Sequence, residues 1–437
     1  MKIDRLRSAA KPLSDIVRDL DPLLAACGDS PFVLIGEASH GTHEFYEVRA
    51  RITQRLIEER GFQAVVVEAD WPDANRIHRY VRGESTDAAP EEALSTFDKF
   101  PEWMWGNTVI RDFVGWLRSW NNSLPSSDRK AGFYGMDLYS LYRSRAEVVR
   151  YLDSVDPEAA RQARDRYACF DHFSENPESY GYTVAFGGRP SCESEALQQL
   201  IAIRSVDPQD GPSAEDAKFY AEQNARLVKN AEEYYRTMFA GRVSSWNLRD
   251  RHMADTIDAL CDHIAGRGVR PKVVIWAHNS HLGDARATDM AKRGEWNVGQ
   301  LMRERHPGET FLIGFTTYTG TVMAADDWGS PGHIKRVRPG TPGSYERLFH
   351  ETGIPRFLLN LRETTMEGRL LERAIGVIYR PDTERYSHYF AADLRAQFDA
   401  VIHIDETHAV RPIRATHTEH DNAAERDTVP ETFPTGV

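Results

Sequence analysis

The chain has 437 residues, 41% hydrophobic and 10% aromatic, which is enough for about two or three domains with sizeable cores. Its 66 acidic residues outnumber its 54 basic ones, and the net charge of −12 argues against a nucleic-acid or membrane partner. No apolar run approaches the roughly 20 residues of a membrane span, and the N-terminal stretch lacks the apolar segment of a secretion signal. We therefore expect a cytoplasmic protein.

The first elements along the chain alternate between helix and strand. Apolar spacing predicts a helix over 12–27, and PFVLIGEA (31–38) is the continuously apolar pattern of a strand buried on both faces. After the turn SHGT, helical spacing continues to Gly61, which stops the helix, and FQAVVVEAD (62–70) is a second buried strand. Strand, helix and strand predict a parallel, right-handed βαβ unit.

The same kind of short apolar strand recurs at 132–137, 272–278, 310–317, 355–361 and 400–405. Between 140 and 265 the pattern is mostly helical, with long amphipathic stretches at 215–239 and 247–266. The segment 173–194 is rich in Gly, Pro, Ser and Tyr and resembles an ordered loop or cap more than a sheet element. These patterns predict an α/β fold, in which helices cover both faces of a central parallel sheet and a large helical insertion forms a cap.

This organisation predicts four segments. Residues 1–138 form the first part of the α/β core, 139–268 the helical insertion, 269–410 the second part of the core, and 411–437 a loose polar tail. The chain has four widely spaced cysteines and no CxxC pair, so we expect reduced thiols rather than a disulfide framework: Cys27, Cys169, Cys192 and Cys261.

Titratable side chains follow several of the predicted strands. Because open parallel sheets bind ligands beyond the carboxyl ends of their strands, these groups should meet at one edge although they are far apart in sequence. The groups at the strand ends are Glu37, Glu68, Asp70, Asp137, His278 and His281. This convergence predicts a catalytic site.

His40 lies three residues after the first buried strand, where the next helix begins. The helix dipole disfavours a protonated imidazole there, and a neutral histidine is what a general base requires near pH 7. Glu37 could accept the proton on the far ring nitrogen and fix the tautomer. The alternative is that both residues only cap the turn, and for His43 and Glu44, inside the first helical turn, the capping interpretation is favoured.

Arg49 lies on the helix that follows the turn, where it can face the sheet near Glu68. An arginine beside buried carboxylates keeps them ionised or steadies a developing oxyanion, whereas on the surface it would only join a helical salt-bridge network. Glu68 ends the strand VVVE and needs a buried partner, either Arg49 or a histidine.

Several common catalytic motifs are missing from the sequence. It has no GxSxG elbow, P-loop, GxGxxG after a strand or HExxH, and no cysteine beside a strand-end histidine. Water activated by a histidine–carboxylate system remains, with or without a metal.

The motifs GEASHG (36–41), VVVEAD (65–70) and WAHNSH (276–281), with Arg49 between the first two, resemble the erythromycin esterase family, as do NLRDRHMA (247–254) and ERYSHYF (384–390). The resemblance covers nearly the whole chain and implies an α/β core with a helical cap that hydrolyses a carboxylic ester, in some members a macrolide lactone. Its functional positions fall on Glu37, His40, Arg49, Glu68, His278 and His281, with His40 as the base, and on His388 by resemblance alone. A substrate pocket could be lined by Trp103, Trp105, Trp116 and Trp120, although tryptophans at helical spacing also fit the core.

The leading hypothesis is a hydrolase that cleaves a small-molecule ester or lactone with histidine-activated water and needs no cofactor. Arg49, or a protonated histidine of the 278/281 pair, would stabilise the oxyanion. One alternative uses the same cluster to bind a divalent metal, although Arg49 would oppose a cation there. Another is a non-catalytic protein that binds a ligand in the cap.

Overall fold

The computed structural model describes residues 3–15, 18–126, 129–173, 175–207, 211–239, 241–366 and 368–413. Of the polar tail predicted for 411–437, everything from 414 onward lies outside the described residues. The chain forms two compact units, one drawn from 1–68, 76–133 and 270–437 and the other from 69–75 and 134–269.

The described residues contain a nine-stranded sheet. Eight of its strands lie in the order β1-β8-β11-β6-β2-β5-β3-β4, and the ninth, β7, pairs with β6. Its strands are β1 (Lys11–Pro12), β2 (Phe32–Ile35), β3 (Ala64–Asp70), β4 (Gly132–Asp137), β5 (Val273–Trp276), β6 (Thr310–Ala324), β7 (His333–Val337), β8 (Arg356–Asn360) and β11 (Ala400–Thr407). The central pairs are parallel, whereas β1, β7 and β8 pair antiparallel with their neighbours. The predicted α/β class is confirmed, and every segment predicted as a strand contains one.

The βαβ unit predicted near the N-terminus consists of β2, α3 (His43–Arg60) and β3. Gly61 ends α3 in the left-handed conformation, with φ of 69°. The two strands run in the same direction but are not neighbours, because β5 lies between them and pairs with both. This arrangement brings the end of β5, although about 200 residues later in the chain, beside the ends of β2 and β3.

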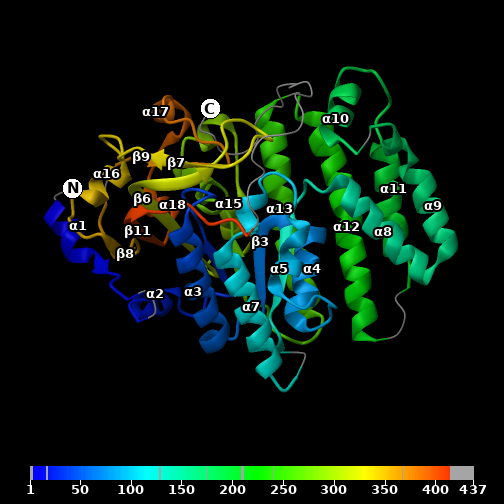
Figure 1. Cartoon of the computed structure of the whole chain (residues 1–437), viewed down its shortest axis with the longest axis horizontal. Coiled ribbons are helices and arrows are strands. Elements are labelled where there is room, and N and C mark those ends of the chain that lie inside the picture. The colour runs from blue at the N-terminus through cyan, green and yellow to red at the C-terminus, as the bar shows by residue number, and fades with distance from the viewer. Residues whose placement is uncertain are drawn as a thin grey trace. The chain divides into compact units, whose positions relative to one another are not determined.

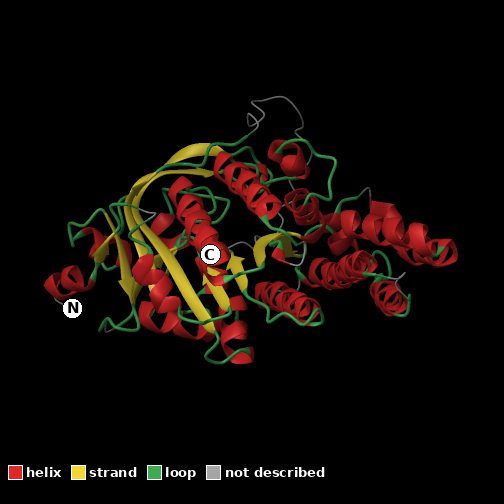
Figure 2. Ribbon diagram, turned by 90° about the horizontal axis from the view of Figure 1, so that it is seen from below, coloured by secondary structure: helices red, strands yellow, loops and turns green. Residues whose placement is uncertain are grey.

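Helices pack against the sheet of the first unit (Figure 2). They include α2 (Asp21–Cys27), α7 (Thr108–Ser123), α15 (Val298–Arg305) and α16 (Tyr345–His350), whereas α1 (Ile3–Ala9) precedes β1 in the chain. The helix predicted over 12–27 is wrong in its first half, because Lys11 and Pro12 pair with β8 and the helix begins only at Asp21. Pro22 explains the start, since proline is tolerated in the first turn of a helix but not in its interior.

The second unit is mainly helical (teal to green in Figure 1). Its helices are α8 (Leu141–Val155), α9 (Pro157–Tyr167), α10 (Pro177–Ala185), α11 (Glu193–Arg204), α12 (Pro212–Thr237) and α13 (Arg242–Ala265). The loop predicted for 173–194 contains α10, because the Asn176 side chain accepts a hydrogen bond from the Ser179 amide and Pro177 occupies the first turn. Strong capping here outweighs the low helix propensity of the segment.

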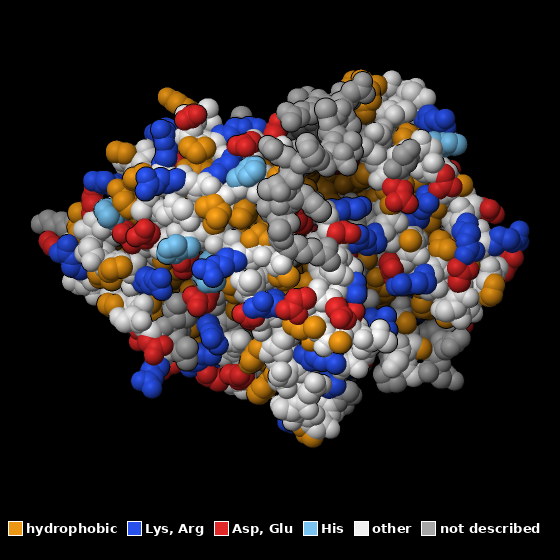
Figure 3. Space-filling model, viewed as in Figure 1, with side chains coloured by type: hydrophobic (Ala, Val, Ile, Leu, Met, Phe, Trp, Pro, Cys, Tyr) orange, Lys and Arg blue, Asp and Glu red, His pale blue; other side chains and the backbone are white. Residues whose placement is uncertain are grey.

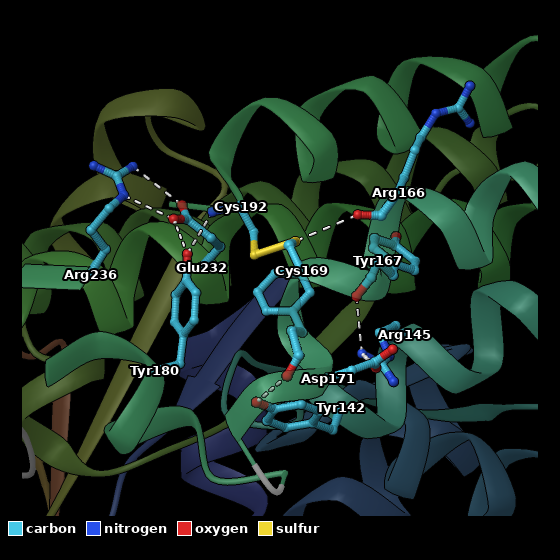
Figure 4. Close-up of a disulfide and its surroundings, with 11 residues drawn as sticks. Tyr142, Arg145, Arg166, Tyr167, Cys169, Asp171, Tyr180, Cys192, Glu232 and Arg236 are labelled. Carbon is cyan, nitrogen blue, oxygen red and sulfur yellow. Dashed lines mark hydrogen bonds and ion pairs between the residues drawn. A yellow bond between two sulfur atoms is a disulfide. The ribbon is translucent and has the colours of Figure 1, made fainter. Parts of the chain in front are cut away.

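The prediction of four reduced thiols is wrong for one pair, since Cys169 and Cys192 form a disulfide (Figure 4). Their Cα atoms are 6.0 Å apart, although the two residues are separated by 23 positions in the sequence. No local spacing pattern can reveal such a contact. The bridge lies beside Tyr180, whose hydroxyl donates to Glu232 at 2.6 Å. Cys27 and Cys261 are buried free thiols, and burial raises the pKa of each to about 12.

In the described part of the chain, every helix is too short or too polar to cross a bilayer. On the face visible in Figure 3, acidic and basic side chains are interspersed rather than gathered into one field.

Candidate active site

The turn after β2 is built by close backbone contacts. The Gly36 amide donates to the Ile313 carbonyl of β6 at 2.8 Å, and a Cβ on Gly36 would lie 2.2 Å from the Asn279 amide oxygen. Gly41 is equally constrained, because a Cβ there would lie 1.9 Å from the Met323 carbonyl oxygen. The glycines let the chain turn tightly enough to place Glu37 and His40 at the sheet edge, both fully buried.

Glu37 joins the histidine to the arginine. Its Oε1 lies 2.9 Å from Nδ1 of His40, and its Oε2 accepts a hydrogen bond from Nη2 of Arg49 at 2.6 Å. The Arg49 guanidinium is sandwiched between the rings of Tyr46 and Trp276, with its Cζ 4.4 and 5.2 Å from the ring centroids. Arg49 therefore pairs with Glu37, so of the two partners predicted for Glu68, Arg49 or a histidine, it is not the arginine that Glu68 has.

The carboxylate of Glu68, at the end of β3, has histidine partners instead. Its Oε1 lies 3.4 Å from Nε2 of His281 and 4.0 Å from Nε2 of His40, while its Oε2 accepts the backbone N–H of His278 at 2.9 Å. The backbone carbonyl of Glu68 also accepts the indole N–H of Trp105 at 3.0 Å. Glu68 thus joins the ends of β3 and β5 and faces the imidazole of the β2 turn.

His278 caps α14 (Asn279–Leu282), where its Nδ1 accepts the backbone N–H of Ser280 at 3.2 Å. A backbone N–H only donates, so Nδ1 carries no proton and a neutral His278 carries its proton on Nε2. Burial, followed by the nearby His40, holds the pKa of His278 well below its usual value. Its ring lies 5.1 Å from that of His40, centroid to centroid.

The structure thus gathers six of the predicted residues, all buried, at one edge of the sheet in the first unit: Glu37, His40, Arg49, Glu68, His278 and His281. Asp70 and Asp137 belong to the second unit. There Asp137 pairs with Arg249 at 2.6 Å, and burial together with Asp73 and Asp137 raises the pKa of Asp70 to about 8. Glu44 is buried and accepts hydrogen bonds from His408, so it anchors a loop.

Three of the residues predicted to contact substrate are buried. Trp103 and Trp105 lie on α6 (Glu102–Trp105) and are 0% and 4% exposed. His388 follows α17 (Glu384–Ser387), where its Nε2 accepts the Arg380 amide at 3.1 Å and burial lowers its pKa to about 4. In this structure these side chains pack in the interior rather than line an open surface.

Asn279 was not singled out from the sequence although it lies within the motif WAHNSH. Its backbone N–H donates to the carbonyl of Glu37 at 2.8 Å. Its side-chain amide donates to the carbonyl of Phe315 at 2.8 Å and accepts the Phe315 amide at 3.2 Å. A buried asparagine between two histidines in a strand-end motif was the available signal.

The chemistry of the cluster is that of a polarised imidazole. The Glu37 carboxylate accepts the Nδ1 proton of His40, which leaves the Nε2 lone pair facing the Glu68 side. No group of three or more His, Cys, Asp or Glu side chains in the described residues has an arrangement that could hold a metal ion.

The fold and the cluster together define an α/β protein with a buried histidine–carboxylate site at the end of its parallel strands. The erythromycin esterase family model matches residues 57–407, most of the chain, and the chain therefore belongs to the erythromycin esterase family. The match includes Glu68, His278 and His281, whereas the turn with Glu37 and His40 precedes it.

Known proteins are similar at low identity. A putative hydrolase of Bacillus subtilis, YbfO, is 22% identical and spans 89% of this chain and 86% of its own length. The erythromycin esterase type II of Escherichia coli is 21% identical, over 89% of this chain and 92% of the relative. A solved structure described as a succinoglycan biosynthesis protein has a TM-score of 0.76 at 21% identity, covering 94% of this chain and 97% of that one. The structural likeness establishes the shared fold, and the family relatives support a hydrolase.

Proposed function

We propose that the chain hydrolyses a carboxylic ester or lactone with water that His40 activates. The observation that carries the proposal is the 2.9 Å contact between Nδ1 of His40 and the Glu37 carboxylate, which leaves Nε2 as the basic nitrogen. Family relatives named as esterases and as a hydrolase support the same reaction class.

In this reaction Nε2 of His40 takes a proton from water while the water oxygen bonds to the carbonyl carbon of the substrate. The tetrahedral intermediate then collapses, and His40 returns the proton to the leaving alkoxide, giving an acid and an alcohol. Glu37 stabilises the transient imidazolium, and Arg49 keeps Glu37 ionised. Because Nε2 of His40 is buried, substrate binding has to displace atoms that cover it.

His278, rather than Arg49, stabilises the oxyanion. Arg49 is fully buried and committed to Glu37 and the two flanking rings. In neutral His278 the Nε2–H is the donor of the ring, because Nδ1 accepts the Ser280 amide. Its ring is adjacent to that of the base, so a carbonyl oxygen can bind there while water attacks from the His40 side.

The test is a panel of aryl esters, aliphatic lactones and one macrolide lactone, with products identified by mass. Each is incubated with the wild type and with His40→Asn, which keeps a donor near the Nδ1 position but lacks Nε2. We expect hydrolysis of at least one substrate and a loss of about 10³-fold in kcat for His40→Asn. His43→Ala, three residues along the same turn, is the matched control and should retain the wild-type rate.

Binding without any product in the whole panel would instead support the ligand-binding alternative. An unchanged hydrolysis rate for His40→Asn would show that His40 is not the base, even if the chain is an esterase. The macrolide member of the panel decides whether the substrate class of the named erythromycin esterases extends to this chain.

We also propose that the reaction needs no metal ion, since the Glu37–His40 pair alone supplies a base. Dialysis against a chelator should leave both kcat and the unfolding temperature unchanged. Loss of activity that returns with Zn²⁺ or Mn²⁺ would establish the metal-dependent alternative.

A further inference from the structure

Asn279 links the candidate site to a second group of buried carboxyls. Its side-chain amide donates to Oε1 of Glu372 at 3.2 Å, in addition to its bond with the Phe315 carbonyl. Glu372 lies on β9 (Leu370–Arg373) and is 0% exposed. The Gln397 side chain is its second hydrogen-bonding neighbour.

Among the residues that the structure describes, no lysine or arginine side chain forms an ion pair with Glu372. Glu346 of α16 is also fully buried, and its Oε1 accepts the backbone N–H of Arg373 at 2.9 Å. The Arg373 guanidinium is directed elsewhere, to the carbonyls of Tyr318 and Arg338 and to Glu384 at 3.1 Å. A charge on Glu372 would therefore be buried close to another carboxyl.

The protonation of Glu372 follows from these neighbours. Burial, and then the charge of Glu346, raise the pKa of Glu372 to about 8, against the opposing hydrogen bonds from Gln397 of α18 (Leu394–Gln397) and Asn279 of α14. Burial also raises the pKa of Glu346, which Arg373 opposes. At neutral pH Glu372 is mainly the uncharged acid.

We propose that Glu372 is a positioning residue for the candidate active site, where its neutral carboxyl holds Asn279 and thereby the segment that carries His278 and His281. The inference rests on the proposed function. Asn279 connects Glu372 to the candidate site, because its backbone N–H donates to the Glu37 carbonyl and its side chain hydrogen-bonds to Phe315 of β6. An ionised Glu372 would accept the Asn279 amide more strongly, but without a cation beside it among the described residues the buried charge would move toward water. Asn279 would then shift with the carboxylate.

A pH-dependent loss of activity follows. With a pKa of about 8 for Glu372, the fraction of neutral acid falls about tenfold between pH 7 and pH 9, and kcat should fall by the same factor. The isosteric variant Glu372→Gln cannot ionise and should keep its kcat across this range. Glu363→Gln, which removes an exposed carboxylate a few residues earlier, is the control and should follow the wild type.

Glu346→Gln gives a result that a merely structural role for Glu372 would not produce. Removing the charge that helps to raise the pKa of Glu372 should move the alkaline midpoint of kcat to lower pH. KM should change less than kcat in these variants, because the histidines act on the reacting atoms. A Glu372→Gln enzyme with the wild-type alkaline loss would overturn the proposal.

A measurement without substrate separates this inference from the proposed hydrolysis. Unfolding releases the Glu372 proton once the pH exceeds about 4.3, the value in an unfolded chain, whereas the folded protein holds it up to about pH 8. The wild type should therefore lose unfolding temperature, relative to Glu372→Gln, as pH rises from 5 to 8. Parallel curves for the two proteins would reject the neutral acid even if esters are hydrolysed, and divergent curves would support it even if none is.

Discussion

Glu37 is the side chain on which the other candidate catalytic groups depend. One oxygen orients the imidazole of His40, and the other is neutralised by Arg49 within a buried environment. Coulomb interactions are strong where water is excluded, so neither partner can be removed without leaving a buried charge. The orientation of the His40 ring and the stability of the first unit are therefore coupled through one carboxylate.

Arg49→Met should lower the free energy of unfolding by about 3 to 5 kcal/mol, because Glu37 would remain buried without its cation. It should also reduce kcat, since an uncompensated Glu37 tends to bind a proton and then no longer polarises His40. Urea titration measures the first effect. The matched control is Arg51→Met, an exposed position of the same helix, and a comparable loss there would show that the Arg49 effect is not due to the buried pair.

His278 makes the fold sensitive to acid. Its pKa is held well below 6.5 in the folded protein, so the unfolded chain binds a proton that the folded chain does not as pH falls below about 6.5. The unfolding temperature should fall between pH 7 and pH 5, and His278→Gln should fall less over this window. His252→Gln removes a second buried histidine, with a pKa of about 3, and should have the same effect. If the unfolding temperature of both variants fell with pH as steeply as that of the wild type, this origin of the acid sensitivity would be contradicted.

Among the structural elements, the turn between β2 and α3 is held by packing rather than by local sequence preference. The Gly41 carbonyl accepts the amides of Met323 and Val410, from two distant segments, and Gly36 lies against Asn279 and β6. The turn that carries Glu37 and His40 is therefore positioned by the strands around it, so the candidate site stands on rigid elements instead of a free loop.

Gly36→Ala should destabilise the protein and lower kcat, because the new Cβ would meet the Asn279 oxygen at 2.2 Å and displace the histidine segment. Gly115→Ala is the opposite case. Gly115 lies inside α7, and the nearest atom to a Cβ there is 3.8 Å away, so alanine should stabilise the helix by about 0.5–1 kcal/mol. Thermal unfolding measures the expected loss of stability in Gly36→Ala and the expected gain in Gly115→Ala. Equal destabilisation of both variants would show that the close contact at Gly36 is not the cause.

At the level of the whole chain, the two units differ in what stabilises them. The six candidate site residues lie in the unit with the buried parallel strands, whereas the Cys169–Cys192 bridge belongs to the helical unit. A cross-link of this kind restricts the unfolded chain and typically contributes about 2–4 kcal/mol.

Reduction with a dithiol should therefore lower the unfolding temperature of the transition that involves the helical unit. Calorimetry with and without reductant measures the shift. A Cys169→Ser/Cys192→Ser variant should already show the lower temperature and should no longer respond to the reductant. Cys27→Ser is the control, because that thiol is free, and it should respond to the reductant as the wild type does. If the double variant still responded to the reductant, another linkage would be involved.

The α/β class, the strands and the family could be predicted from the sequence because each depends on local patterns. Buried parallel strands are continuously apolar, α3 ends at its glycine, and the family motifs are contiguous. The meeting of Glu37, Glu68 and His278 also followed, since the carboxyl ends of parallel strands share an edge.

Other features depend on which distant segments pack together, and no periodicity records that. Arg49 pairs with Glu37, and its guanidinium lies against the rings of Tyr46 and Trp276, the second of which is more than two hundred residues away in the chain. Cys169 and Cys192 form a disulfide because the helical unit packs them together. Glu372 accepts a hydrogen bond from Asn279, which is almost a hundred residues earlier in the chain. The neutral state of Glu372 depends on burial and on the charge of Glu346, and both exist only after the chain has folded.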